Sequence, residues 1–297
     1  MRNRKFPVST IARVLGVSRS NLYAREKSTA RASNYSKTED VELLSFIRKI
    51  VSERQTYGYR RTTVMLNKHL AALGKPKVNH KRVYRIMRQN GMLLVRYTGK
   101  RPGKVHDGKV CTETSNRRWC SDGFEIPCEN GERVRVIFGL DTCDREIMAY
   151  EASCTGYTAD MAQNVMLGCV EARFGKPVTP HKIEWLTDNG SCYSAKETIQ
   201  FGIMLGMECR FTPVRSPQSN GMAESFVKTF KRDYIFSHAR PDATSVMDHL
   251  KEWFEDYNEN APHKALRMLS PREFIRSRES ELSPREMGAT LKAMAYM

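Results

Sequence analysis

The sequence predicts an α/β domain with a mixed five-stranded sheet and flanking helices, preceded by all-α helix-turn-helix domains. Three observations support this fold class. After Arg117 the hydrophobic pattern alternates between strands and helices in the order β-β-β-α-β-α-β-α. Before residue 96 the apolar residues recur at helical spacing, in two separate segments. The excess positive charge lies in those helical segments. Three antiparallel strands followed by parallel crossovers make a mixed sheet with helices on both faces.

The composition excludes several classes of protein. The chain has 297 residues, 40% hydrophobic and 28% charged, which suits folded domains and argues against disorder throughout. No run of about 18 apolar residues occurs and no cleavable leader follows the basic N-terminus, so we expect neither a membrane protein nor a secreted one. The eight cysteines form no CxxC pair, which predicts reduced thiols in a cytoplasmic protein.

The net charge of +16 is unevenly distributed. Residues 1–110 hold 26 lysines and arginines against 6 aspartates and glutamates, whereas residues 111–297 hold 23 against 27. One end of the chain therefore carries a net charge of +20 and the rest −4. A domain with such an excess binds a polyanion, and nucleic acid is the first candidate; a basic surface that only aids solubility is the alternative.

Residues 1–34 are predicted to form a helix-turn-helix. Apolar residues at helical spacing between residues 9 and 15 predict a first helix, which Gly16 ends, and Ser18 is a suitable N-cap for the next. An ordinary helical hairpin is the alternative. The side chains of the second helix that can reach phosphates and base edges are Arg19, Asn21 and Arg25.

A second helical domain is predicted over residues 35–95. Its helices cover 38–54, 61–73 and 80–90, and a basic linker over 96–117 follows. The domain either contacts DNA, which we favour, or is a basic bundle that docks on its neighbour. The side chains predicted to bind DNA are Arg60, Arg61, Lys81, Arg82, Arg85 and Arg88.

The α/β domain is predicted over residues 118–276, with a C-terminal tail over 277–297. The predicted strands are 119–126, 134–141, 147–153, 183–187 and 208–212, with a hairpin turn at 129–132. The predicted helices are 158–174, 194–205 and 220–234, the last preceded by a loop at 213–219.

Three acids of this domain are candidate catalytic and metal-binding residues. Asp122 lies within the first predicted strand, Asp188 follows the short apolar strand at 183–187, and Glu224 lies early in the helix at 220–234. Sites in open α/β sheets form near the carboxyl ends of strands, so the three can converge. Three carboxylates suit a pair of Mg²⁺ ions in phosphoryl transfer. Each acid alone is more often a cap or a dipole partner.

Two lysines share the helix face of Glu224. Lys228 and Lys231 follow it at i+4 and i+7, which places all three on one side of the helix. We expect them to bind DNA phosphates near the acids. For Lys228 an ordinary solvated helix face is almost as good an interpretation. A cysteine or histidine nucleophile is disfavoured, because neither Cys192 nor His263 has a visible orienting partner.

The motifs that hold the acids resemble a known family. WCSDGF, LTDNGSCY and SPQSNGMAESFVKTFKRDY are similar to the three acidic motifs of the DDE transposases related to retroviral integrases, and Lys231 matches the lysine seven residues after the Glu. YNENAPHKALRMLSPREF resembles the segment that closes the family's catalytic domain. TYGYRR and KRVYRIMRQNGML resemble the helical domain before it. The nearest resemblance is to the second-reading-frame product of two-frame bacterial insertion sequences. Gly123 stands where many members carry Thr or another small residue.

This resemblance implies an RNase H-like catalytic domain that uses Mg²⁺ or Mn²⁺, two ions per site, held by Asp122, Asp188 and Glu224. It implies binding to double-stranded DNA, both the inverted-repeat ends of the element and its target, and strand cleavage followed by strand transfer. It also implies a homo-oligomer on DNA, a possible partnership with the first-reading-frame product, and a nucleoid-associated place in a bacterial cytoplasm. Two alternatives stay open: an RNase H-fold nuclease without joining activity, and a DNA-binding regulator whose catalytic domain is inactive.

Overall fold

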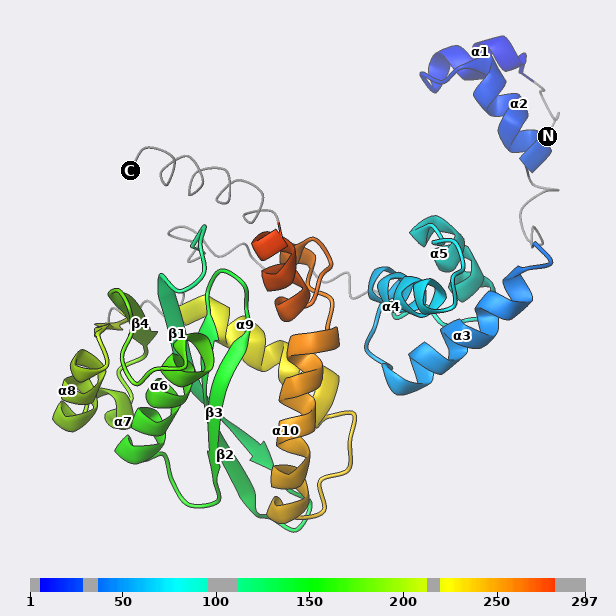
Figure 1. Cartoon of the computed structure of the whole chain (residues 1–297). Coiled ribbons are helices and arrows are strands. Elements are labelled where there is room, and N and C mark those ends of the chain that lie inside the picture. Colours follow the sequence, from blue (N-terminus) through cyan, green and yellow to red (C-terminus); the bar gives the residue numbers. More distant parts are fainter. Residues whose placement is uncertain (1–5, 29–36, 96–111, 213–219, 281–297) are drawn as a thin grey trace, which may run out of the picture. The chain divides into compact units, whose positions relative to one another are not determined.

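The computed structural model describes residues 6–28, 37–95, 112–212 and 220–280 (Figure 1). The chain divides into two compact units, residues 1–95 and 96–297, and each is considered by itself. The predicted linker at 96–117 lies mostly outside the described residues, as do the loop at 213–219 and most of the predicted tail. A helix runs through residues 271–280 and so continues past residue 276, the predicted end of the catalytic domain. Within these ranges no helix is both long and apolar enough to cross a membrane.

The first unit begins with two short helices, α1 (Val8–Val14) and α2 (Arg19–Ser28). Gly16 between them has φ +62°, a left-handed conformation that glycine adopts without a Cβ penalty. The Ser18 hydroxyl accepts a hydrogen bond from the Asn21 backbone N–H at 3.2 Å, as expected of an N-cap. The two helices, the glycine turn and the serine cap expected here are therefore present.

Three further helices form a small bundle: α3 (Asp40–Glu53), α4 (Tyr59–Ala72) and α5 (His80–Gln89). Their buried apolar side chains meet in one cluster, built from Leu43, Ile47, Leu66, Leu70, Val83, Ile86 and Met87. The Asn79 side chain accepts from the Lys81 backbone N–H at 2.9 Å and caps α5, as predicted. Helix α4 begins two residues earlier than predicted, because Gly58 is extended and Tyr59 already has helical geometry.

The second unit is built around a five-stranded sheet in the order β3-β2-β1-β4-β5. The strands are β1 (Arg118–Pro127), β2 (Arg133–Asp141), β3 (Ile147–Ser153), β4 (Ile183–Thr187) and β5 (Met207–Phe211). β1 pairs antiparallel with β2, and β2 with β3, whereas β4 is parallel to both β1 and β5. This is the mixed five-stranded sheet that the sequence predicted.

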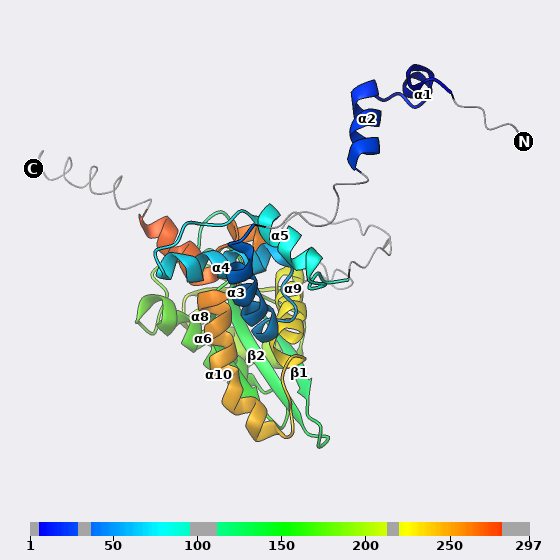
Figure 2. The ribbon, with the colours of Figure 1, turned by 90° about the vertical axis from the view of Figure 1, so that its right-hand side faces the viewer.

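Helices cover both faces of the sheet. On one face, α6 (Ala159–Phe174), α7 (Ser191–Ser194) and α8 (Lys196–Met204) follow the crossovers, and α6 and α7 contribute to a core centred on Trp119 and Trp185. On the other lie α9 (Gly221–Phe230) and α10 (Ala243–Asn260), next to β1 and β2 (Figure 2). They pack on these strands through an aromatic cluster that includes Phe226 and Phe254. Odd and even residues of β1 thus enter different cores.

Two predicted helices differ in detail. The helix predicted at 194–205 is α8, Lys196–Met204, and begins two residues later because Ala195 is extended, with ψ 134°; the one-turn helix α7 before it was not predicted. The helix predicted at 220–234 is α-helical only to Phe230, and Lys231–Ile235 forms one turn of π-helix, η2. Such wide turns are rare and recur at functional sites. The cysteines of the described ranges are free thiols, as predicted, and Cys111 lies outside them.

Candidate active site

Parallel pairing of β1 and β4 brings the two aspartates to one level of the sheet. Cys120 pairs with Leu186 in that ladder. Asp122 and Asp188 each follow two residues later, so they leave the paired region side by side. Asp122 is mostly buried, and Asp188 is exposed just beyond the end of β4. The turn after β4 is closed by the Gly190 backbone N–H, which donates to the Asp188 carboxylate at 3.0 Å.

A buried serine connects the three segments that carry the acids. The Ser121 hydroxyl hydrogen-bonds the Tyr193 hydroxyl at 2.8 Å, which ties β1 to the turn after Asp188. The Ser121 carbonyl accepts from the Asn220 side-chain amide at 3.1 Å, which ties β1 to the start of α9. All three side chains are at least 95% buried. We call them the Ser121 junction, and it positions Glu224 one helical turn beyond Asn220.

The electrostatics show that the acids share one environment. The pKa of Asp122 is raised to about 6, first by burial and then by the negative charges of Asp188 and Glu224. The Gly123 backbone N–H and the charge of Lys231 act in the opposite direction. The three acids are therefore near enough for the charges of Asp188 and Glu224 to act on Asp122. That they form one catalytic site stays a prediction.

The acids do not form a closed ligand set. Across residues 6–28, 37–95, 112–212 and 220–280, no three His, Cys, Asp or Glu side chains lie close enough to hold one metal ion together. Glu224 instead pairs with Lys228 at 3.6 Å, across one turn of α9. Like charges repel unless a cation separates them, so an open arrangement is expected of the protein alone. Carboxylate oxygens are donors that fit a hard divalent ion by their chemistry.

The two predicted lysines differ in their surroundings. Lys228 is 79% exposed and pairs only with Glu224 in the described part of the chain. Lys231 is half-buried, begins the π-helical turn, and places its ammonium 5.8 Å from the centre of the Phe124 ring. Lys231 therefore has a defined position beside Asp122, whereas Lys228 has the freedom of a surface side chain.

The Ser121 junction leads to a test. Tyr193→Phe removes one buried hydroxyl and leaves the Ser121 hydroxyl without its partner. We expect a loss of about 1–2 kcal/mol in the free energy of unfolding and a drop of about 10–100-fold in strand-transfer rate, because the Asp188 turn is no longer tied to β1. Urea unfolding and a strand-transfer assay measure the two effects.

The matched control is Tyr150→Phe. Tyr150 is half-buried, stacks on Phe254 with ring centres 4.2 Å apart, and its hydroxyl makes no hydrogen bond within the described residues. This change should leave both quantities nearly unaltered. Equal effects of the two substitutions would mean that the Ser121 junction has no special role.

The lack of a side chain at Gly123 leaves room for a neighbouring aromatic ring. A Cβ at this position would lie 2.9 Å from Cε1 of Tyr157, closer than side chains pack. The ring therefore covers the strand beside Asp122 only because residue 123 is glycine. Burial raises the pKa of Tyr157 to about 12, and nearby Glu125 adds to the effect, so its hydroxyl stays protonated.

We expect Gly123→Ala to lower the free energy of unfolding by about 1–3 kcal/mol, through contact with that ring. Tyr157→Ala in the same chain should cancel the added cost, so a double-mutant cycle in urea should show coupling between the two positions. Gly156→Ala is the control, because no atom lies within 4 Å of a Cβ there. Additive effects at 123 and 157 would show that the contact carries no energy.

The predicted DNA-binding residues of the first unit fall into two groups. Arg82 donates to Asp40 at 2.7 Å, and Arg85 also pairs with this carboxylate. Burial raises the pKa of Asp40, but the Lys37 backbone N–H and the two arginines outweigh it and hold the pKa below its ordinary value. Arg82 and Arg85 thus tie α5 to the start of α3, a packing role that the sequence did not reveal.

The remaining basic residues are placed differently. Lys81, Arg88 and Arg60 are exposed, as are Arg19 and Asn21 of the helix-turn-helix. Arg61 is half-buried, with its guanidinium 3.6 Å from the centre of the Tyr57 ring. The side chain of Arg25 lies outside the described residues. These exposed residues are accessible to a ligand, and their contact with DNA stays a prediction.

Cys192 and His263 lack the surroundings of an activated nucleophile. Cys192 is 9% exposed, and burial, followed by the charge of Asp188, raises the pKa of its thiol. His263 packs edge-on to Tyr257, with ring centres 5.0 Å apart.

Sequence reasoning missed Ser121, Tyr193 and Asn220, although each lies within one of the three quoted acidic motifs. These residues stand in the motifs, but their contacts with one another become visible only in the structure.

Comparison with known proteins decides the family. Residues 112–217 and 205–271 each match a family model described as an integrase core domain, and residues 38–101 match one described as an HTH-like domain. The chain is 49% identical over 281 residues to the transposase InsD for insertion element IS2A/D/F/H/I/K of Escherichia coli, and the match covers 93% of both chains. The chain belongs to the InsD transposase family.

Other members and solved structures are also similar. The transposase InsD for insertion element IS2-9 of Escherichia coli strain K12 is 49% identical, over 93% of this chain and 91% of that one. A chain of the simian T-cell lymphotropic virus intasome in complex with PP2A regulatory subunit B56 gamma aligns with a TM-score of 0.46 and 16% identity, covering 77% of this chain and 73% of that chain. Membership of the InsD transposase family confirms the predicted class, an insertion-sequence transposase with an integrase core domain.

Proposed function

We propose that this transposase binds the inverted-repeat ends of its element, cleaves a DNA strand there and joins the freed end to target DNA. The observation that carries this proposal is the Ser121 junction, which ties the three acid-bearing segments together beside a carboxyl whose pKa responds to both other acids. Phosphoryl transfer needs such a cluster of oxygen donors at one point. We assign Asp122, Asp188 and Glu224 as its catalytic residues.

The donors suit Mg²⁺ or Mn²⁺, and we propose two ions per site. Asp122 and Asp188 lie side by side and would hold both, and Glu224 would complete one of them. When bound, the ions supply positive charge to the attacking and leaving oxygens of an in-line displacement. The raised pKa of Asp122 means that a cation must displace a proton near pH 6, and thus that metal affinity rises with pH through that range.

The chain's own side chains orient the DNA. Lys231 is held against Phe124 and places its ammonium beside Asp122, where it can bind a phosphate next to the scissile one. The ammonium of Lys228 can leave its ion pair with Glu224 and bind a phosphate instead, once Glu224 turns toward a metal ion. The exposed basic residues of the first unit, among them Arg19, Lys81 and Arg88, would position the duplex through its backbone.

We further propose that the transposase acts as a homo-oligomer on DNA in the bacterial cytoplasm, alone or with the first-reading-frame product. Two DNA ends must be joined to one target, and the described part of each chain offers one proposed set of three acids, on β1, after β4 and on α9. An assembly with several copies supplies a site for each end. Sedimentation of the chain with and without end DNA, and with the first-frame product added, would determine this composition.

The deciding experiment incubates the full chain with labelled duplexes that carry the element ends, a supercoiled target and Mg²⁺. We expect products in which the labelled strand is joined to the target. Hydrolysed ends without joined products would instead identify an RNase H-fold nuclease. Binding without any cleavage, unaffected by Asp188→Asn, would identify a DNA-binding regulator.

A further inference from the structure

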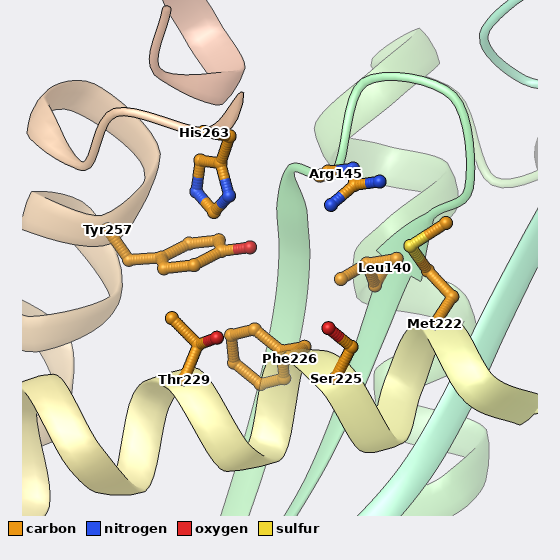
Figure 3. A pocket seen from close by; sticks show the side chains of 8 residues that line it. All are labelled: Leu140, Arg145, Met222, Ser225, Phe226, Thr229, Tyr257 and His263. Atoms are coloured by element: carbon orange, nitrogen blue, oxygen red, sulfur yellow. The ribbon is translucent and has the colours of Figure 1, made fainter. Parts of the chain in front are cut away.

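A small polar pocket lies beside α9, the helix that carries Glu224. Its rim is formed by Arg145 from the turn between β2 and β3, Tyr257 and His263 from α10 and the segment after it, and Ser225 and Thr229 from α9 (Figure 3). Figure 3 shows these polar groups facing one space over an apolar floor that includes Leu140 and Phe226. None of the predicted site residues belongs to this pocket.

The pocket is adjacent to the catalytic face. Ser225 directly follows Glu224, and Thr229 directly follows Lys228. The two hydroxyl side chains therefore lie about 100° round the helix axis from Glu224 and Lys228. A DNA strand that reaches Asp122 and Glu224 can therefore continue across α9 to the pocket. The position alone makes it a candidate contact for the substrate.

The donors of the rim select an anion. A guanidinium, an imidazole and three hydroxyls surround the space, and no acidic residue lines it. Arg145 forms no ion pair with any acid in the described parts of the chain. The acids that flank it in sequence, Asp144 and Glu146, are already paired with Arg173 at 2.8 and 3.1 Å. An uncompensated arginine among hydroxyls is the usual composition of a phosphate site.

Two backbone segments at the pocket contain residues in the left-handed conformation. Arg145 has φ +64°, a conformation that costs an arginine about 1 kcal/mol or more and that is kept at functional positions. The turn after His263 holds Arg267 at φ +56° and Met268 at φ +67°, and returns so that the His263 N–H donates to the Leu269 carbonyl at 2.9 Å. Both segments that supply a cationic group are thus held in disfavoured conformations.

The size of the space defines what enters it. The cavity volume is about 20 Å³, room for a single oxygen-sized group and not for a base or a sugar. We infer that the pocket receives a phosphodiester oxygen of the DNA strand that crosses α9, bound by Arg145 and His263 and by the hydroxyls of α9. This rests on the proposed function only in taking DNA as the ligand; its test is binding in the absence of metal.

Arg145→Gly is the central variant. Glycine suits φ +64°, so the substitution removes the guanidinium and relieves backbone strain instead of adding it. Arg267→Gly is the matched control, because Arg267 is also a left-handed arginine, is exposed, and lies outside the pocket. The full chain is titrated with a short duplex without metal, at several salt concentrations. One lost phosphate contact lowers the slope of log K against log salt by about 0.9.

We expect Arg145→Gly to lower that slope by about 0.9 and to weaken binding several-fold, while Arg267→Gly changes neither. Arg145→Lys, which keeps the charge, should recover most of the slope. Equal slopes for Arg145→Gly and the unaltered chain would overturn the inference, as would equal losses in the two glycine variants. Melting curves of both variants establish that they are folded.

A second arm distinguishes DNA from free anion. Inorganic phosphate is added to the unaltered chain and to Arg145→Gly, and the melting temperature is followed. If phosphate stabilises the unaltered chain alone while the DNA slopes are identical, the pocket binds a free anion and the inference about DNA fails. Failure of the proposed chemistry would appear separately, as absent strand transfer with the Arg145 effect on binding retained.

Discussion

Asp122→Asn should abolish strand transfer while making the metal-free protein more stable. The amide keeps the size of the side chain but removes the negative charge that a divalent ion requires. We expect the strand-transfer rate to fall by about 10³-fold or more, because the ion's stabilisation of the displaced oxygens amounts to several kcal/mol. Duplex binding by the helical unit should persist, so a mobility-shift assay serves as the check that the variant still engages DNA.

The stability gain follows from the direction of the pKa shift. Burial, together with the charges of Asp188 and Glu224, raises the pKa of Asp122 from 3.8 to about 6. The folded protein therefore binds this proton more tightly than the unfolded chain, and stability is lost as pH rises from about 4 through 6. At pH 7 without metal, Asp122→Asn should be more stable by up to about 2–3 kcal/mol. Urea unfolding at pH 4 and pH 7 measures the difference.

Adding metal should act in the opposite direction. Mg²⁺ should raise the melting temperature of the unaltered chain, and a chelator should cancel the rise, whereas Asp122→Asn should respond to neither. Asp160→Asn is the control, since Asp160 is exposed in the first turn of α6 and lies outside the site. An Asp122→Asn variant that joins strands at the normal rate would end the assignment of these acids as catalytic.

Arg173→Met should cause the largest loss of stability. Arg173 lies in the last turn of α6, and its side chain is 9% exposed. It donates to both oxygens of Asp144, which is fully buried, at 2.8 and 3.0 Å. Removing the arginine leaves a buried carboxylate uncompensated, so we expect the free energy of unfolding to fall by about 3–5 kcal/mol.

Arg173→Met should also change the pKa of a second acid, Asp141. Burial and the charge of Asp144 raise the pKa of Asp141 to about 6, and the charge of Arg173 opposes them. Without Arg173 this pKa should rise further, and the loss of stability should therefore grow as pH increases from 5 to 8. Denaturant unfolding across that range tests both points.

Arg276→Met is the matched control for Arg173→Met. Arg276 pairs with Glu259 at 2.9 Å, but its side chain is 57% exposed, and surface pairs contribute about 1 kcal/mol or less. If the two methionine variants lose the same stability, the buried network around Asp144 does not have the role assigned to it.

Local pattern predicted most of the fold. The segments that became β3 and β4 were bounded as the structure has them, and α5 and α6 within one residue, because alternation, helical spacing and capping residues act within a few positions. Irregularities within and between helices were harder to predict. The π-helical turn at Lys231 interrupts a segment that was predicted as one continuous helix, and the one-turn helix α7 was not predicted.

Sequence alone determined the family and the uneven charge and selected the three candidate acids, since each depends on residue types and short spacings. The tertiary structure alone decided what holds those acids in place. Ser121 meets Tyr193 and Asn220 across 72 and 99 positions. It likewise decided that Arg82 and Arg85 pair with Asp40, 42 and 45 positions away. Contacts of this range depend on strand register and helix packing, which are properties of the whole chain and of no single segment.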